Sequence, residues 1–120
     1  MQSSLAYHDQ PLDRDHLKRM ALGDIALERE VLSMFVAQAS RLIDAIACEP
    51  AQTSAKQVRA MAHTLKGSAQ AIGAFGVADH AAALEAALQR GEKATEALGH
   101  LREAVTAARA AIEAILKNSP

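Results

Sequence analysis

A three- and four-residue alternation of apolar side chains runs through most of this 120-residue chain and favours helices throughout. The pattern is almost strict in the last quarter, where it predicts a helix over 93–117. Each residue turns a helix by about 100°, so apolar residues spaced in this way share one face. The residues of that face are Leu98, Leu101, Val105, Ala108, Ile112 and Ile115.

The first half of the chain is expected to hold a short helix and a long one. The short helix is predicted from Asp13, its N-cap, to about Leu22. Asp24 then caps a long helix that ends before Pro50, and residues 49–53 form a short connection. The near-heptad apolar face of the long helix comprises Ile25, Leu32, Phe35, Val36, Ala39, Leu42, Ile43 and Ile46.

Two more helices are predicted before the last one. The first begins at Thr53 or Ser54, and Gly73 and Gly76 are expected to break it within a turn of about three residues. The second ends where Gly91 suits a left-handed C-terminal cap. Its apolar face comprises Val77, Ala81, Leu84 and Leu88.

Long amphipathic helices with short connections favour antiparallel neighbours, and no strand pattern is evident. The sequence therefore predicts an all-α fold, an antiparallel up-down four-helix bundle with a short additional N-terminal helix. Half of the residues are apolar, enough for one core. We expect a single domain over residues 12–117, with a flexible N-terminal tail over 1–11 and a C-terminal tail over 118–120.

Charge and cysteine content exclude several classes of protein. The formal net charge is −1, so the basic excess of a nucleic-acid-binding protein is absent. Cys48 is the only cysteine, which permits no internal disulfide and provides no metal-ligand spacing. There is no signal-peptide pattern and no apolar run of about 20 residues. We therefore expect a cytoplasmic protein with no membrane partner.

His63 is the most informative side chain, because it lies opposite the apolar face of its predicted helix. Gly67 shares the polar face, and a glycine inside a helix costs about 1 kcal/mol relative to alanine. A glycine retained beside an exposed histidine indicates that another molecule must come close to the imidazole. The residues within about 60° of His63 are Lys56, Arg59, Lys66, Gly67 and Gln70, and those opposite are Val58, Met61, Leu65, Ala69 and Ile72.

This part of the chain resembles a known family. The segment His63–Ser68, followed by Ile72–Ala74, is similar to the signature of histidine phosphotransfer (HPt) domains of multistep phosphorelays. The similarity extends over about residues 12–116. Phe35 stands at the usual aromatic position of the preceding helix, and segment 84–91 resembles the end of the following helix.

The resemblance implies a role for each polar residue near the histidine. His63 would accept a phosphoryl group on Nε2, and Lys66, one turn away, would neutralise phosphoryl oxygens. Gly67 would leave clearance for the partner. A polar side chain of the next helix often steadies the imidazole in this family, and Glu85 is the best positional match. Arg59 and Lys56 are expected to attract an acidic partner surface, and Gln70 is expected to donate a hydrogen bond to phosphate.

The expected function is that of a phosphoryl carrier, which accepts the group from a receiver-domain aspartate and passes it to another receiver. Lys66–Ser68 is not part of a nucleotide-binding loop, because the surrounding GxxxxGK[ST] pattern is absent. No other histidine has a helical spacing to His63 that would build a metal site. We therefore expect no cofactor in this chain, with Mg²⁺ on the partner receiver. The expected partners are response-regulator receiver domains and a hybrid histidine kinase, and the chain is expected to be a monomer.

Three alternatives belong to other classes. A helical adaptor could bind a receiver or kinase without being phosphorylated, but it would have no need for the histidine. The chain could instead be the histidine-bearing domain of a chemotaxis-type kinase, although it begins with Met1 and shows no dimerisation or ATP-binding segment. A generic self-associating bundle is the third. Acid-labile, base-stable label on this chain after incubation with phosphorylated receivers would separate the carrier from the adaptor.

Overall fold

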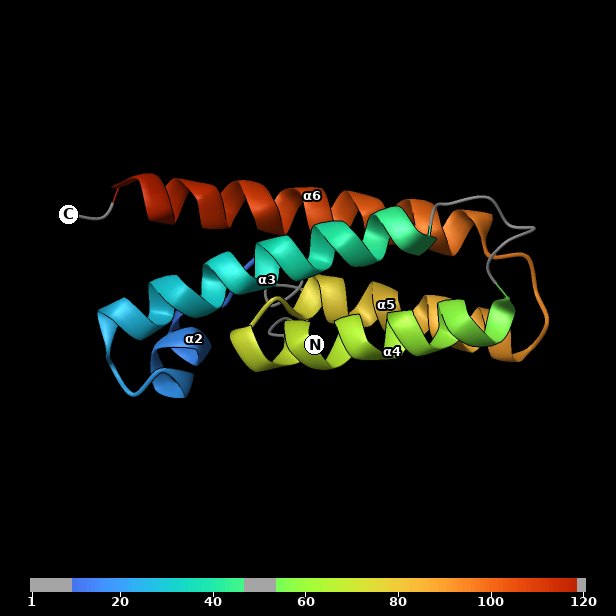
Figure 1. Ribbon diagram of the computed structural model, residues 1–120, viewed down its shortest axis with the longest axis horizontal. Helices are drawn as coiled ribbons and strands as arrows, with labels where there is room; N and C mark the ends of the chain where they lie inside the picture. Colours follow the sequence, from blue (N-terminus) through green and yellow to red (C-terminus); the bar gives the residue numbers. More distant parts are fainter. Residues whose placement is uncertain (1–9, 47–53, 119–120) are drawn as a thin grey trace.

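Four long helices run alternately in opposite directions along the bundle (Figure 1). The computed structural model describes residues 10–46 and 54–118. The predictions for Cys48, Pro50, the connection over 49–53, the cap at Thr53 and most of the two tails lie outside these residues. The helices are α2 (Arg14–Met20), α3 (Ile25–Ile46), α4 (Ala55–Ile72), α5 (Phe75–Gln89) and α6 (Thr95–Asn118).

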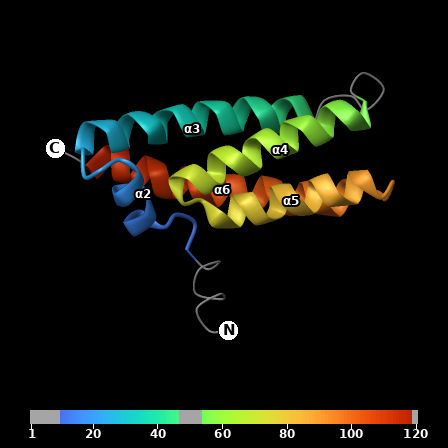
Figure 2. The ribbon, with the colours of Figure 1, turned by 90° about the horizontal axis from the view of Figure 1, so that it is seen from below.

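The long helices form a closed ring of neighbours. α4 packs against α3 and α5, and α6 closes the ring against α5 and α3. The short α2 packs against α4, at the end of the bundle where α3 begins and α4 ends (Figure 2). The predicted four-helix bundle with a short additional helix is therefore confirmed for the described residues. No helix of the described ranges is long and apolar enough to cross a membrane.

Side-chain caps start α2, α3 and α4 where the sequence predicts them. The backbone N–H of His16 donates to the Asp13 carboxylate at 3.0 Å, and that of Leu27 donates to Asp24 at 3.1 Å. At the start of α4, Ser54 accepts from the Gln57 N–H while the Gln57 side chain accepts from the Ser54 N–H. These bonds satisfy N–H groups that have no partner inside the helix.

The turn between α4 and α5 is built on Gly73 alone. Gly73 has a left-handed φ of +91°, which favours glycine, and its carbonyl accepts a 2.9 Å hydrogen bond from the Asp13 N–H. The prediction that Gly76 also breaks the helix is wrong, because Gly76 is the second residue of α5. A glycine in the first turn is compatible with the helix, since its N–H needs no intrahelical partner there.

The core lies between the predicted apolar faces, with one exception on α3. Leu32, Phe35 and Ala39 are buried, but Ile25 is 67% exposed. Ile25 is the first residue of α3, and the apolar periodicity alone does not show that its side chain is left exposed at this end of the helix. Conversely Glu28, a charged residue, is buried. The other buried apolar residues of the long helices include Ala62, Leu65, Ala69, Val77, Ala81, Leu84, Leu101, Val105, Ala108 and Ile112.

Substituting Gly73 tests how tightly α2 is held to the α4–α5 turn. A Cβ at Gly73 would lie 2.7 Å from the Asp13 carbonyl oxygen, whereas one at Gly91 would have no atom within 4 Å. Both glycines have positive φ, so Gly91→Ala measures the backbone strain alone, about 1 kcal/mol. Gly73→Ala should cost about 3 kcal/mol, because the clash adds to the strain. Urea unfolding gives both values, and equal losses would show that the Asp13 contact adjusts without cost.

Candidate functional site

His63 projects from the solvent-facing side of α4, near the middle of the bundle. The apolar face of the helix is buried at Ala62, Leu65 and Ala69, and this burial fixes the direction in which the opposite face points. The His63 side chain is 65% exposed. A large molecule can therefore reach the imidazole without any rearrangement of the core.

Glu85 of α5 connects the imidazole to Lys66. Its Oε2 lies 3.0 Å from His63 Nδ1, and its Oε1 lies 3.4 Å from Lys66 Nζ. A carboxylate accepts hydrogen bonds, so in the neutral ring this contact places the imidazole proton on Nδ1. Nε2 is then left with its lone pair free. Glu85, the best positional match in the sequence for a side chain that steadies the imidazole, is thus in contact with it.

The ion pair with Lys66 changes what Glu85 contributes to the site. Partial burial tends to raise the pKa of Glu85, but hydrogen bonds and positive charge from Lys66 and His63 outweigh burial and hold it below the ordinary value of 4.5. Glu85 therefore stays ionised at neutral pH. The ammonium of Lys66 lies beside it, so the negative charge next to the imidazole is largely compensated.

Gly67 has no structural reason for being glycine. It lies within α4, it does not have a positive φ, and a Cβ built there would have no neighbouring atom within 4 Å. Alanine would stabilise the helix by about 1 kcal/mol at such a position. Glycine at this position therefore leaves open space beside His63 for an approaching molecule, although it lowers the stability of the helix.

The structure does not join every predicted residue to this cluster. Lys56, Arg59 and Gln70 share the His63 face of α4, but within the described ranges none of them makes a hydrogen bond or ion pair with His63, Lys66 or Glu85. Lys56 and Gln70 lie seven residues from His63 in opposite directions, about 10 Å along the axis. Their predicted roles in partner or phosphate binding stay predictions.

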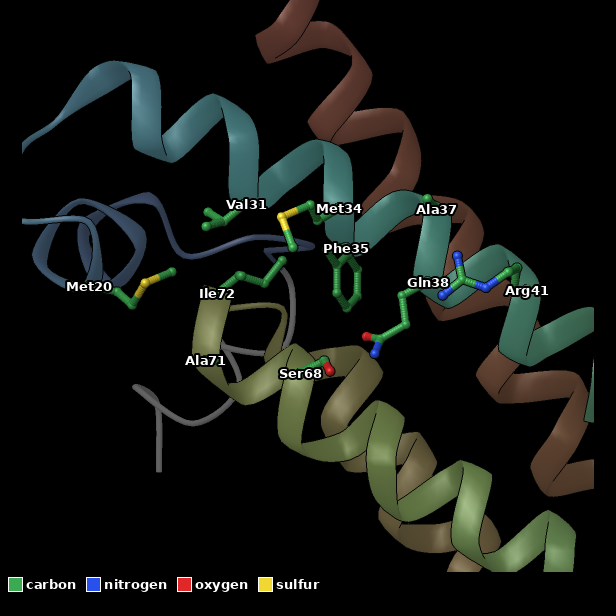
Figure 3. A pocket seen from close by; sticks show the side chains of 10 residues that line it. All are labelled: Met20, Val31, Met34, Phe35, Ala37, Gln38, Arg41, Ser68, Ala71 and Ile72. Carbon is green, nitrogen blue, oxygen red and sulfur yellow. The ribbon is translucent and has the colours of Figure 1, made fainter.

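An apolar groove beside the histidine was not anticipated from the sequence. Figure 3 shows it between α3 and the C-terminal half of α4, with Met20 of α2 at one end and Gln38 and Arg41 towards the other. Its volume is about 530 Å³. Met34 lines the groove and is 62% exposed. The sequence feature that could have indicated the groove is Met34, an apolar residue outside the heptad face of α3.

The groove lies at the flank of the His63 face of α4. Ala71 and Ser68 line it, and Ala71 lies about 80° around the helix and 12 Å along it from His63. Gly67 lies between the two in angle. By these angles, Gly67 lies on the side of His63 that turns towards the groove.

Comparisons with known proteins agree with this geometry. The family model of the Hpt domain matches residues 30–111, so the chain belongs to the Hpt domain family, whose members carry phosphoryl groups on a histidine in phosphorelays. This confirms the resemblance that the motif around His63 indicated. No curated protein matches the chain in sequence.

Three solved structures share the fold. Histidine-containing phosphotransfer protein B from Pseudomonas aeruginosa has 19% identity and a TM-score of 0.82, covering 92% of this chain and 97% of that one. The HPT domain of a sensor hybrid histidine kinase from Shewanella has 19% identity and a TM-score of 0.77, covering 94% and 97%. A putative histidine-containing phosphotransfer protein from rice has 22% identity and a TM-score of 0.79, covering 95% and 85%.

The titration of Glu85 tests the ion pair directly. NMR of its carboxyl carbon should give a pKa below 4.5, and Lys66→Met should raise it, because the hydrogen bond and charge of the ammonium are lost. Lys56→Met is the matched control, since Lys56 lies on the same helix face but does not contact Glu85. The folded-state pKa is depressed, so the contribution of the pair to stability is present above the ordinary pKa and is lost as pH falls through the folded one. Equal Glu85 titrations in both variants would contradict the ion pair.

Proposed function

We propose that His63 is the residue on which this Hpt domain carries the phosphoryl group. The observation that carries the proposal is the contact between Nδ1 and Glu85 at 3.0 Å, together with an imidazole that is 65% exposed. A nucleophile for phosphoryl transfer needs a free lone pair that can align with the bond to be broken. Nε2 meets this requirement, and the proton on Nδ1 keeps it in that state.

The proposed reaction is a reversible exchange between an aspartyl phosphate and His63. The Nε2 lone pair forms the P–N bond while the P–O bond to the aspartate breaks, and the carboxylate leaves with the electron pair. No proton has to leave Nε2, because the neutral ring carries its proton on Nδ1. The resulting phosphoimidazole is cationic in the ring, and Glu85 stabilises it through the Nδ1–H hydrogen bond.

Lys66 is proposed to neutralise charge in both states of the carrier. Before transfer it compensates Glu85, to which it lies within 3.4 Å. After transfer the phosphoryl group adds nearly two negative charges, and an ammonium one turn away can share its hydrogen bonds with the phosphoryl oxygens. A carboxylate without this cation would repel the incoming group.

The partner is proposed to be a receiver domain that docks over Gly67 and the apolar groove. Exposed Met34 and the groove provide apolar surface of the kind that marks protein interaction sites. Gly67 allows close approach, and Arg59 and Lys56 lie on the same face to attract an acidic rim. The Mg²⁺ expected for the reaction is proposed to be held by the receiver, beside its aspartate. A hybrid histidine kinase is the proposed source of the phosphoryl group, and the carrier is proposed to act as a monomer.

Phosphotransfer from a labelled receiver tests the proposal. Wild-type protein should acquire acid-labile, base-stable label, and His63→Gln should acquire none while keeping its helical circular dichroism. His16→Gln is a matched control, because it also removes a histidine but leaves His63 intact. Full labelling of His63→Gln would overturn the assignment, and wild-type binding without any label would favour the adaptor.

The same assay separates the chemistry from the docking. Gly67→Gln should slow transfer from the receiver at least about tenfold, since its side chain occupies the approach path, yet it should be more stable than wild type because glycine is a poor helix former. A small phosphoramidate donor, which needs no protein-sized clearance, should label Gly67→Gln as fast as wild type. Equal losses with both donors would mean that Gly67 acts on His63 itself.

A further inference from the structure

A second pair of histidines lies on the other side of α5 from Glu85. His80 of α5 and His100 of α6 face each other where these two helices pack together, with ring centroids 5.6 Å apart and ring planes tilted by 54°. Positions 80 and 85 differ by about 140° around α5, so His80 is directed towards α6 while Glu85 is directed towards α4. The pair therefore belongs to a different surface from the phosphoryl site.

An open cleft of about 250 Å³ surrounds the two rings. Besides the histidines it is lined by Pro11, Gly76, Val77 and Glu103, and by small alanines of α6. His80 is half-buried and His100 is exposed, so the cleft is open to solvent. Within the described residues neither imidazole makes a hydrogen bond through a ring nitrogen, and the lone pairs of both rings are available to a ligand.

We propose that His80 and His100 bind one divalent transition-metal ion of the class that prefers imidazole, with Zn²⁺ and Cu²⁺ as its members. A metal–nitrogen bond of about 2.1 Å places the centre of an imidazole about 3.2 Å from the ion, so two rings on one ion have centres about 5–6 Å apart. The observed separation of 5.6 Å lies in this range. Neutral imidazole is the commonest protein ligand for such ions.

The rest of the coordination sphere is water. No three His, Cys, Asp or Glu side chains of the described ranges come together closely enough to hold a metal ion by themselves. Glu103 lines the same cleft one turn after His100, where its carboxylate can accept hydrogen bonds from metal-bound water. Two protein ligands define an exchangeable site rather than a structural one, and an ion there links α5 to α6.

Titration with Zn²⁺ alone tests this site, and His63→Gln is used as the background so that the exposed phosphoryl-site imidazole cannot compete. Calorimetry should give one equivalent of bound Zn²⁺, and the imidazole ¹⁵N resonances of His80 and His100 should shift together. His80→Gln or His100→Gln should each weaken binding about tenfold or more. His16→Gln is the matched control and should leave binding unchanged, because the His16 ring nitrogen already contacts the Ala71 carbonyl oxygen and His16 does not line this cleft.

Further readouts keep the test decisive. Zn²⁺ should raise the Tm of the background protein and not that of His100→Gln, because only a folded-state site adds stability. Cu²⁺ should displace Zn²⁺, following the usual order of divalent affinities. Absence of binding at about 1 mM Zn²⁺, loss of binding in His16→Gln, or ¹⁵N shifts at only one of the two rings would each overturn the proposal. These results do not depend on whether His63 carries a phosphoryl group.

Discussion

The close packing of α4 against α5 is the constraint on which the site depends. Ala62 and Ala69 of α4 and Ala78 and Ala81 of α5 are almost completely buried. Small side chains at a helix contact allow the axes to approach towards the short end of the usual range of about 8–10 Å. Because of this approach, the side chain of Glu85 reaches the imidazole of the neighbouring helix. A larger residue at the contact would move the two helices apart and lengthen the distance between Glu85 and His63.

The electrostatics of the site depend on one carboxylate that lies between an imidazole nitrogen and an ammonium group. Glu85 holds the Nδ1 proton of His63 through one oxygen and the ammonium of Lys66 through the other. The first contact keeps Nε2 nucleophilic and later stabilises the phosphorylated ring. The second removes most of the repulsion that a carboxylate would exert on a phosphoryl group. Neither contact requires burial of His63, and the imidazole stays open to a partner of protein size.

Periodicity and capping signals in the sequence were sufficient to predict the arrangement of the helices. Asp13, Asp24 and Ser54 cap helices as predicted, because the cap bonds are local and need no knowledge of the neighbours. The two errors have different causes, one in the packing of neighbouring helices and the other in where α5 begins. Ile25 continues the apolar pattern but is exposed, and Gly76 resembles a helix breaker but lies in the first turn of α5.

The part of the candidate site that lies on a single helix, α4, could be predicted from the sequence. His63, Lys66 and Gly67 follow from the angular positions on α4, whereas Glu85 came from the family resemblance and not from the residues. Its double contact with His63 and Lys66 depends on how α4 and α5 pack, which no local pattern records. The groove at Met34 and the facing rings of His80 and His100 likewise arise between helices that are far apart in sequence.

The central claim is that Glu85 holds the proton of His63 on Nδ1 and so leaves Nε2 as the nucleophile. The most direct measurement is the ¹⁵N NMR spectrum of the His63 imidazole at about pH 8, above the ordinary titration range of histidine, in wild type and in Glu85→Leu. Wild type should show a protonated Nδ1 and a free Nε2, the Nδ1 preference should be lost in Glu85→Leu, and the phosphorylated protein should show phosphorus coupling at Nε2. A wild-type ring protonated on Nε2, or a phosphoryl group found on Nδ1, would contradict this account.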